Sequence, residues 1–132
     1  MADTDERTYD VILWGATGFA GRLVAEYVAD NYGNELDWAV GGRNEEKLEA
    51  LVAELTGEVT DLDEIPIVVG DANDRESLDD LAAQTRVVCT TVGPYAKYGS
   101  HLVAACVAQK TDYCDLTGEV AWMREMIDEH HE

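Results

Sequence analysis

Apolar residues along the chain follow two alternating patterns: short continuous runs, and positions spaced three and four residues apart. The continuous runs predict buried strands, and the wider spacing predicts amphipathic helices. Pro66 lies near the start of the third run, where a strand tolerates a proline. The predicted strands cover residues 9–14, 36–40, 65–69, 86–92 and 111–116.

The helical pattern occurs between these runs. A first helix is predicted to end at Gly33, and a second to begin after Asn44, a good N-cap, and to stop at Gly57. Asn73 and Glu76 have the spacing of a capping box in front of a third helix. The apolar positions that mark the helices are Leu23, Val24, Tyr27 and Val28 within residues 19–31, then Leu48, Leu51, Val52 and Leu55, then Leu78 and Leu81, then Leu102, Val103, Cys106 and Val107, and finally Trp122, Met123, Met126 and Ile127.

Strand and helix alternate five times, and the strands are apolar on both faces. This combination is typical of an α/β protein with a parallel sheet covered by helices on both sides. Because crossover connections are right-handed, few strand orders remain. We predict a doubly wound, Rossmann-like sheet with the order 3-2-1-4-5.

The stretch ILWGATGFAG joins the first predicted strand to the first helix and spaces Gly15, Gly18 and Gly21 three apart. Gly15 permits a sharp turn, Gly18 lets a pyrophosphate approach the helix amides, and Gly21 lets the helix pack closely on the sheet. A turn without a ligand would use the same residues. The position at the first strand–helix junction favours a dinucleotide, with Thr17 donating its hydroxyl to a phosphate.

The sequence after the second strand, VGGRN at residues 40–44, lacks the Asp or Glu with which NAD-binding domains hold the ribose 2′-hydroxyl. It has Arg43 instead, and a guanidinium can pair bidentately with a phosphate. Arg43 therefore predicts NADP(H), with NAD(H) left open. An ordinary surface arginine paired with a carboxylate is the alternative.

The loops after the third and fourth strands belong at the same edge of the sheet. Gly70, Asp71 and Ala72 follow the third strand, where Asp71 could accept a hydrogen bond from the adenine amino group or simply hold a turn. Residues 91–95 follow the fourth strand. We expect this second loop to run beneath the nicotinamide side of the cofactor.

The chain carries 9 Lys and Arg against 28 Asp and Glu, a net charge of −19. Such a charge repels nucleic acid and anionic lipid, which we exclude as partners. Scarce lysine beside abundant carboxylate favours adaptation to molar salt over an ordinary acidic domain. No apolar run could span a bilayer, the N-terminus does not resemble a signal peptide, and the cysteines suit a reducing cytoplasm.

Five stretches together resemble one known family. GATGFAG, GGRN, GDAND, TTVGPYAKYG and ACVAQKTDYCDLTGE are similar to the N-terminal cofactor domain of saccharopine dehydrogenase-like oxidoreductases, which include trans-acting enoyl reductases. The resemblance covers about residues 9–127. GATGF alone is shared with nucleotide-sugar epimerases and semialdehyde dehydrogenases, whereas GPY-x-x-YG followed by DYCDLTGE is more specific. Lys110 departs from the pattern, which has a helix-closing glycine there.

The resemblance implies hydride transfer between a nicotinamide and a C=N, C=O or C=C substrate. It also implies a substrate domain that this sequence lacks, so we expect residues 1–132 to be one NAD(P)-binding domain of a longer enzyme. The predicted cofactor-binding residues are Gly15, Ala16, Thr17, Gly18, Phe19, Gly21, Arg43, Asn44, Asp71, Ala72, Val92, Gly93, Pro94 and Tyr95.

No catalytic residue is predicted. Short-chain reductases use a Tyr and a Lys four residues apart, and no lysine here has a tyrosine at that distance. Cys114 lies in a predicted buried strand beside two aspartates, which would raise its pKa and weaken it as a nucleophile. Four further residues could face a substrate but suit structural roles at least as well: Tyr95, Tyr98, His101 and Glu119.

We therefore expect this chain alone to be inactive and its parent to act on a small-molecule substrate. Two other interpretations stay open: a non-catalytic dinucleotide sensor that reports redox state to a partner, and a relative of the epimerases with the same glycine loop. A homodimer also stays open.

Overall fold

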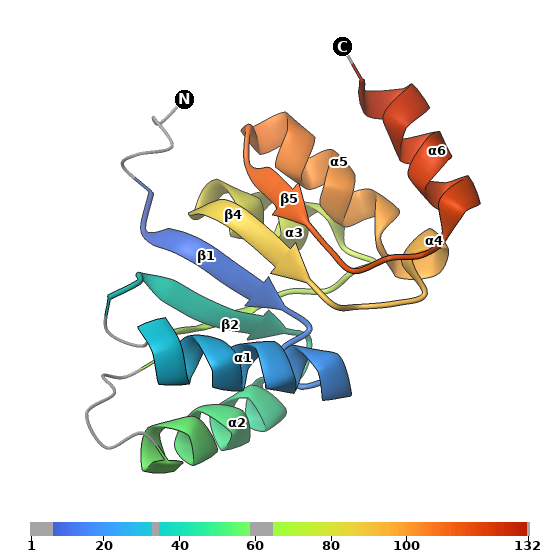
Figure 1. Ribbon diagram of the computed structural model, residues 1–132. Coiled ribbons are helices and arrows are strands. Elements are labelled where there is room, and N and C mark those ends of the chain that lie inside the picture. Colours follow the sequence, from blue (N-terminus) through green and yellow to red (C-terminus); the bar gives the residue numbers. More distant parts are fainter. Residues whose placement is uncertain (1–6, 33–34, 59–64, 132) are drawn as a thin grey trace.

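A computed structural model of the protein describes residues 7–32, 35–58 and 65–131 (Figure 1). Its strands form one parallel sheet with the order β3-β2-β1-β4-β5, which confirms the predicted Rossmann-like arrangement. The strands are β1 (Tyr9–Trp14), β2 (Trp38–Gly42), β3 (Ile67–Val69), β4 (Thr85–Thr90) and β5 (Asp112–Cys114).

Helices connect these strands and cover both faces of the sheet. They are α1 (Phe19–Tyr32), α2 (Glu45–Glu58), α3 (Arg75–Ala83), α4 (Tyr95–Tyr98), α5 (Ser100–Gln109) and α6 (Val120–His130). In Figure 1, α1 and α2 lie together on one face, α3 and α5 lie on the other, and α6 stands beside α5. In the described residues, no helix is both long and apolar enough to cross a membrane.

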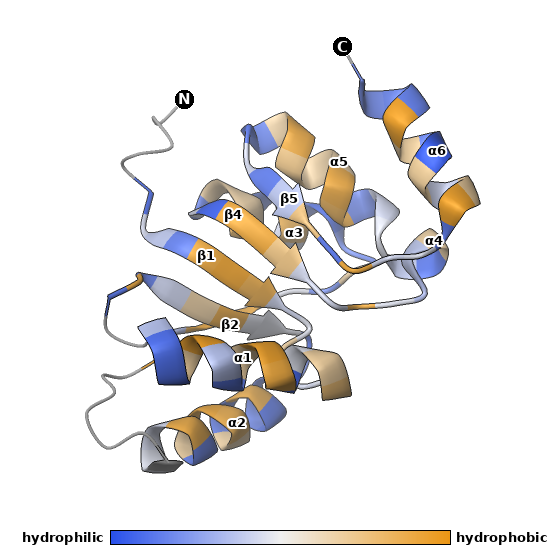
Figure 2. Ribbon diagram, viewed as in Figure 1, coloured by the Kyte–Doolittle hydropathy of each residue, from blue (hydrophilic) through white to orange (hydrophobic). Residues whose placement is uncertain are grey.

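Each face of the sheet has its own apolar core. Ile12 and Trp14 belong to the core beneath α3 and α5, whereas Leu13 belongs to the core beneath α1 and α2. Successive side chains of a strand point to opposite faces, so a strand covered on both sides must be apolar throughout. Figure 2 shows this apolar character along β1 and β4.

The second strand lies two residues later than its apolar pattern predicted. Gly41 pairs with Trp14 and Gly42 pairs with Val69, so both glycines belong to β2. Glycine is uncommon in strands, and the sequence pattern stopped at Val40 for that reason. A Cβ at Gly41 would lie 3.2 Å from the side chains of Ile12 and Trp14, which explains why a glycine occupies this position.

Helix ends differ from their predictions in two places, and a third predicted end cannot be compared. Asn44 caps α2 as predicted, since its Oδ1 accepts the Lys47 N–H at 3.1 Å, but the helix continues through Gly57. The predicted capping box at Asn73 is wrong, because α3 begins at Arg75 after Asp74. The predicted stop of the first helix, Gly33, lies outside the described residues.

The C-terminal half also has boundaries that the sequence pattern missed. Strand β4 ends at Thr90 rather than at residue 92, and β5 is confined to Asp112–Cys114. The short helix α4 was not predicted. It follows a cis peptide bond between Gly93 and Pro94.

Arg7 forms hydrogen bonds with several elements at the end of the sheet opposite the glycine loop, the loop that carries Gly15 and Gly18. Its guanidinium donates to the carbonyl oxygens of Ala82 (3.0 Å), Thr85 (2.8 Å) and Gln109, and to the Thr111 hydroxyl. Arg7 thereby connects the ends of α3 and α5 to β4. The sequence pattern gave no indication of this role.

Candidate cofactor-binding site

The glycine loop has the geometry expected from its sequence. Gly15 adopts a φ of +83°, which L side chains rarely adopt, and its N–H donates to the Gly41 carbonyl at 2.9 Å. A Cβ at Gly21 would overlap the Gly15 carbonyl, so Gly21 sets the close approach of α1 to the loop. A Cβ at Gly18 would meet only the Gly15 oxygen, at 3.5 Å. Gly18 therefore leaves room for a ligand at the N-terminus of α1.

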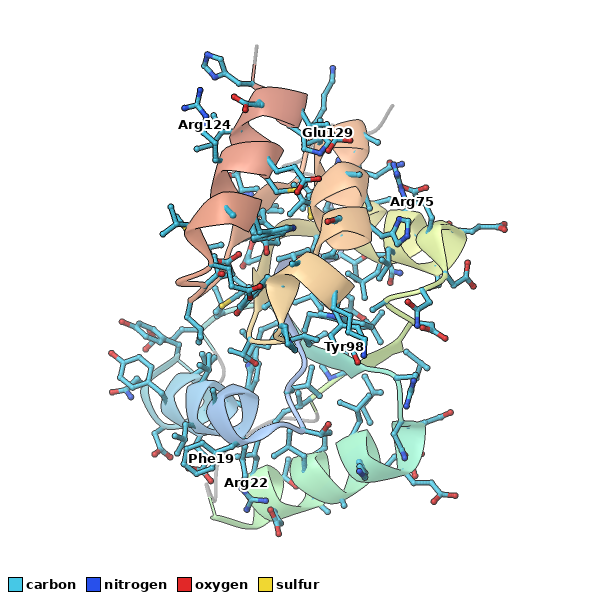
Figure 3. The ribbon with its side chains drawn as sticks, turned by 90° about the vertical axis from the view of Figure 1, so that its right-hand side faces the viewer. Phe19, Arg22, Arg75, Tyr98, Arg124 and Glu129 are labelled. Carbon is cyan, nitrogen blue, oxygen red and sulfur yellow. The ribbon has the colours of Figure 1, made fainter. Side chains whose placement is uncertain are left out.

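A cleft of about 400 Å³ lies beside this loop at the carboxyl ends of the strands. It sits where the strand order reverses between β1 and β4, the position at which open α/β sheets bind ligands. Figure 3 shows Tyr98 extending from α4 toward the space between α4 and the first two helices. The cleft is lined by Trp14, Gly15, Thr17, Gly18, Gly42, Arg43, Asp71, Ala72, Asn73, Thr91, Val92, Gly93 and Tyr98.

The structure brings together eight of the fourteen predicted cofactor residues in this cleft: Gly15, Thr17, Gly18, Arg43, Asp71, Ala72, Val92 and Gly93. The sequence reasoning did not include Trp14, Gly42, Asn73, Thr91 or Tyr98 in its list. Tyr98, in the motif GPY-x-x-YG, was predicted only as a residue that could face a substrate, and the structure places it in the cleft.

The remaining six predicted residues lie outside the cleft. Ala16 is fully buried, and Phe19 is 87% exposed beside Arg22 near the start of α1 (Figure 3). Three others have evident structural positions, namely Gly21 against the loop, Asn44 at the cap of α2, and Tyr95 in the interior. Pro94 provides the N-cap of α4.

Arg43 is exposed at the junction of β2 and α2. In the part of the chain that the structure describes, it makes no ion pair with a carboxylate, so the surface-pair alternative has no support. Arg43 also borders a second, open hollow of about 680 Å³, which adjoins the first at Thr17. That hollow is lined by Thr17, Arg43, Asn44, Glu45, Glu46 and Lys47. An anion there would meet the cations Arg43 and Lys47 and the amide end of α2, together with the carboxylates of Glu45 and Glu46.

Asp71 has a turn function as well as a place in the cleft. Its Oδ1 accepts the Asn73 N–H at 2.9 Å, and its own N–H donates to the Ser77 hydroxyl at 3.0 Å. These bonds shape the connection from β3 to α3. The carboxylate is thus held in a fixed position beside the cleft.

Tyr95 and Glu119 are structural residues of the loop after β4. The Tyr95 hydroxyl donates to the Thr90 carbonyl at 3.3 Å, its ring lies 5.5 Å from that of Trp122, and burial raises its pKa. The Glu119 carboxylate accepts the N–H groups of Tyr95 (2.5 Å) and Ala96 (3.1 Å). It therefore caps α4, the helix that carries Tyr98.

The cysteines occupy three different environments. Cys106 is buried, and burial raises the pKa of its thiol to about 12. Cys89 is half-buried, and its pKa is raised to about 11, first by burial and then by the neighbouring Cys114 and Asp115. Cys114 is exposed, so the prediction that it is buried in a strand is wrong. Among the described residues of β5, only Tyr113 is partly buried, whereas Asp112 and Cys114 are exposed.

Comparison with known proteins identifies the family. Residues 11–132 match the saccharopine dehydrogenase NADP binding domain. The chain belongs to this family. The match covers nearly the whole chain.

Proteins named trans-acting enoyl reductase are similar in sequence to this chain. The chain is 44% identical over 127 residues to a trans-acting enoyl reductase of Mycobacterium leprae, and 44% identical over 126 residues to one of Mycobacterium tuberculosis. Each match covers 96% of this chain and 29% of the relative. The chain therefore spans less than a third of the length of these curated relatives.

Solved structures share the fold at lower identity. Saccharopine dehydrogenase (L-Glu forming) from Saccharomyces cerevisiae superposes with a TM-score of 0.64 at 20% identity, covering 90% of this chain and 24% of that one. A structure titled AtPrR2 with NADP+ and (+)pinoresinol gives a TM-score of 0.61 at 19% identity, covering 94% of this chain and 47% of that one.

Proposed function

We propose that this chain binds NADP(H) for a longer oxidoreductase that reduces an enoyl C=C bond, the chemistry named for its 44%-identical relatives. The cofactor would supply the hydride. The observation that carries the proposal is the cleft at the reversal of strand order, bordered by an open Gly18 and by Arg43, which makes no ion pair with a carboxylate among the described residues. C=O and C=N substrates are the alternatives within the same hydride-transfer class.

Successive residues along the edge of the sheet suit successive parts of a dinucleotide. The amide end of α1 and the open face of Gly18 suit a pyrophosphate. Arg43 and Lys47 suit a phosphate on the adenosine ribose, since both line the hollow beside Thr17. Thr91, Val92 and Gly93 extend the cleft along the end of β4, where the nicotinamide would lie.

Helix α6 supports the proposal that a further domain follows in the full-length protein. Its Trp122 and Met126 are buried beside Tyr95, whereas Val120 (76% exposed) and Ile127 (52% exposed) form a second apolar stripe with Met123. Together the two stripes make an apolar arc wider than the neighbouring elements of this chain cover, and such an exposed apolar surface normally packs against a further partner. The occupant we propose is part of the additional length that the relatives have beyond the region matched by this chain.

The proposal is tested by titrating the purified 132-residue chain with NADPH and NADH in a calorimeter. We expect NADPH to bind more tightly, with no oxidation of NADPH when an enoyl thioester is added, because the chain lacks a proton-transfer pair. Absence of binding to either nucleotide would contradict the cofactor proposal. Steady NADPH oxidation would show that the chain carries its own catalytic group.

A further inference from the structure

Two of the three cysteines lie directly opposite each other on neighbouring strands. Cys89 on β4 and Cys114 on β5 are register partners in the parallel sheet, so their side chains leave the same face. Adjacent strands lie about 4.7–4.9 Å apart, which falls inside the range of about 4.4–6.8 Å that Cα atoms span in disulfides. The Cα spacing expected for these register partners therefore falls within the range that a disulfide spans.

The two thiols also influence each other electrostatically, because Cys114 is, after burial, one of the causes that raise the pKa of Cys89. The pair lies on the face that carries α1, because Cys89 continues the row that begins with Leu13 on β1. Cys106 lies on the opposite face in the core beneath α3 and α5, so it cannot take part.

The two thiols differ in access to solvent. Cys114 is exposed, whereas Cys89 is half-buried beside it. An external oxidant would therefore meet Cys114 first. Asp115 follows Cys114 in the chain, and the acidic molecule as a whole repels anionic reagents, which favours a neutral oxidant.

We propose that Cys89 and Cys114 form a reversible dithiol–disulfide site, oxidised by small neutral disulfides that enter at Cys114. This inference stands on the β4–β5 register and does not depend on the proposed cofactor function. The β4–β5 register already places the two cysteines opposite each other in the reduced protein.

The reaction is a thiol–disulfide exchange in two steps. The Cys114 thiolate attacks one sulfur of the external disulfide, the external S–S bond breaks, and one small thiolate leaves and takes up a proton. The Cys89 thiolate then attacks Cys114 Sγ, forms the Cys89–Cys114 bond and expels the second small thiolate. The two cysteines lose two electrons, the external disulfide gains them, and the two thiol protons end on the two released small thiols.

The experiment treats the folded chain with bis(2-hydroxyethyl) disulfide, which is neutral, and follows intact mass and peptide maps. We expect the chain to lose the mass of two hydrogens, with one peptide pair joined through Cys89 and Cys114. Cys106 should stay reduced, and dithiothreitol should restore the starting mass. The matched control is Cys106→Ala, which should react like the unmodified chain.

Two variants separate the steps. Cys89→Ser should stop with one hydroxyethylthio group on Cys114, and Cys114→Ser should react far more slowly at either remaining cysteine. The proposal is overturned if the unmodified chain accumulates the same mixed disulfide as Cys89→Ser, since Cys89 would then not close the bond. It is equally overturned if the disulfide joins two chains, or if the folded chain does not react at all.

Discussion

Arg43 is the residue on which NADP(H) selectivity depends in our proposal. We expect Arg43→Ala to weaken NADPH binding by roughly 10- to 100-fold, because a hydrogen bond to a charged group contributes roughly 1.5–3 kcal/mol. NADH, which lacks the ribose phosphate, should bind nearly as before. Calorimetry at low salt measures both affinities.

The matched control for this charge change is Arg124→Ala on α6, since Arg124 is exposed and pairs only with Asp128 among the contacts described. It removes one positive charge far from the cleft and should leave both nucleotides unaffected. If Arg43→Ala lowers NADPH and NADH affinity equally, Arg43 binds a group common to both, and the selectivity proposal fails.

Gly18 and Gly21 give opposite expectations for the same substitution. Gly18→Val should fold, because the nearest atom to a Cβ there is 3.5 Å away, but it should abolish nucleotide binding by filling the approach to the amide end of α1. Gly21→Val should unfold the chain, because its Cβ would overlap the Gly15 carbonyl. Far-UV circular dichroism and calorimetry distinguish the two, and a folded Gly18→Val chain that still binds NADPH would remove Gly18 from the site.

The separate roles of these glycines could be predicted from the sequence, because each role depends only on how many residues separate the glycine from the end of β1 and the start of α1. Tyr95 and Phe19 could not be placed in the same way. Tyr95 is buried by Trp122, 27 positions later, and Phe19 is exposed because nothing in the described structure covers that part of α1. A motif gives the spacing of residues along the chain but not which tertiary neighbours surround them.

At the scale of single elements, the end of α5 is strained in a way that can be measured. Lys110 adopts the left-handed conformation (φ 57°) at the C-cap, and the Thr111 N–H donates to the Cys106 carbonyl at 2.8 Å. Glycine normally occupies such a position. We expect Lys110→Gly to be about 1 kcal/mol more stable than Lys110→Ala, since only the alanine retains the strain.

Both Lys110 variants lose the same positive charge. The difference between their unfolding free energies therefore measures the cost of the left-handed backbone conformation alone. Urea denaturation measures it. Equal stability of the two variants would mean that the left-handed conformation carries no cost at this position.

The sequence predicted which segments form strands and helices more accurately than it predicted the residues at which they begin and end. The apolar runs identified all five strands in order, because a two-sided sheet needs continuous apolar stretches. Helix α4 was missed because it depends on Glu119, whose carboxylate caps it from 24 residues further along the chain. Strand β2 was misplaced because Gly41 is required by contact with Trp14, a tertiary constraint.

At the scale of the whole molecule, the two sides of α6 should respond differently to the same change. Ile127→Gln on the exposed stripe should leave the unfolding free energy within about 0.5 kcal/mol of the unmodified chain. Met126→Gln, at a position 9% exposed beside Trp122, should cost about 2 kcal/mol or more, because the amide is buried without a partner. Urea denaturation of the isolated chain measures the unfolding free energy of both variants. A large decrease for Ile127→Gln would show that the outer stripe is already covered within this chain.

The net charge of −19 predicts that the stability of the folded chain depends strongly on salt. The Debye length falls from about 10 Å at 0.1 M to about 3 Å at 1 M, so KCl screens the repulsion among carboxylates that folding brings together. The Tm should therefore rise between these two concentrations.

Salt can also strengthen apolar burial, so a charge-reduced variant is needed as the control. Replacing the exposed Glu49, Glu125 and Glu129 by Gln changes the net charge from −19 to −16, since three negative charges are removed (−19 + 3 = −16). This variant should melt at a higher temperature than the unmodified chain in 0.1 M KCl, and its Tm should rise less between 0.1 M and 1 M, the concentrations at which screening changes most. An equal rise of Tm with KCl in the two proteins would assign the salt effect to apolar burial. The net charge would then no longer support adaptation to molar salt.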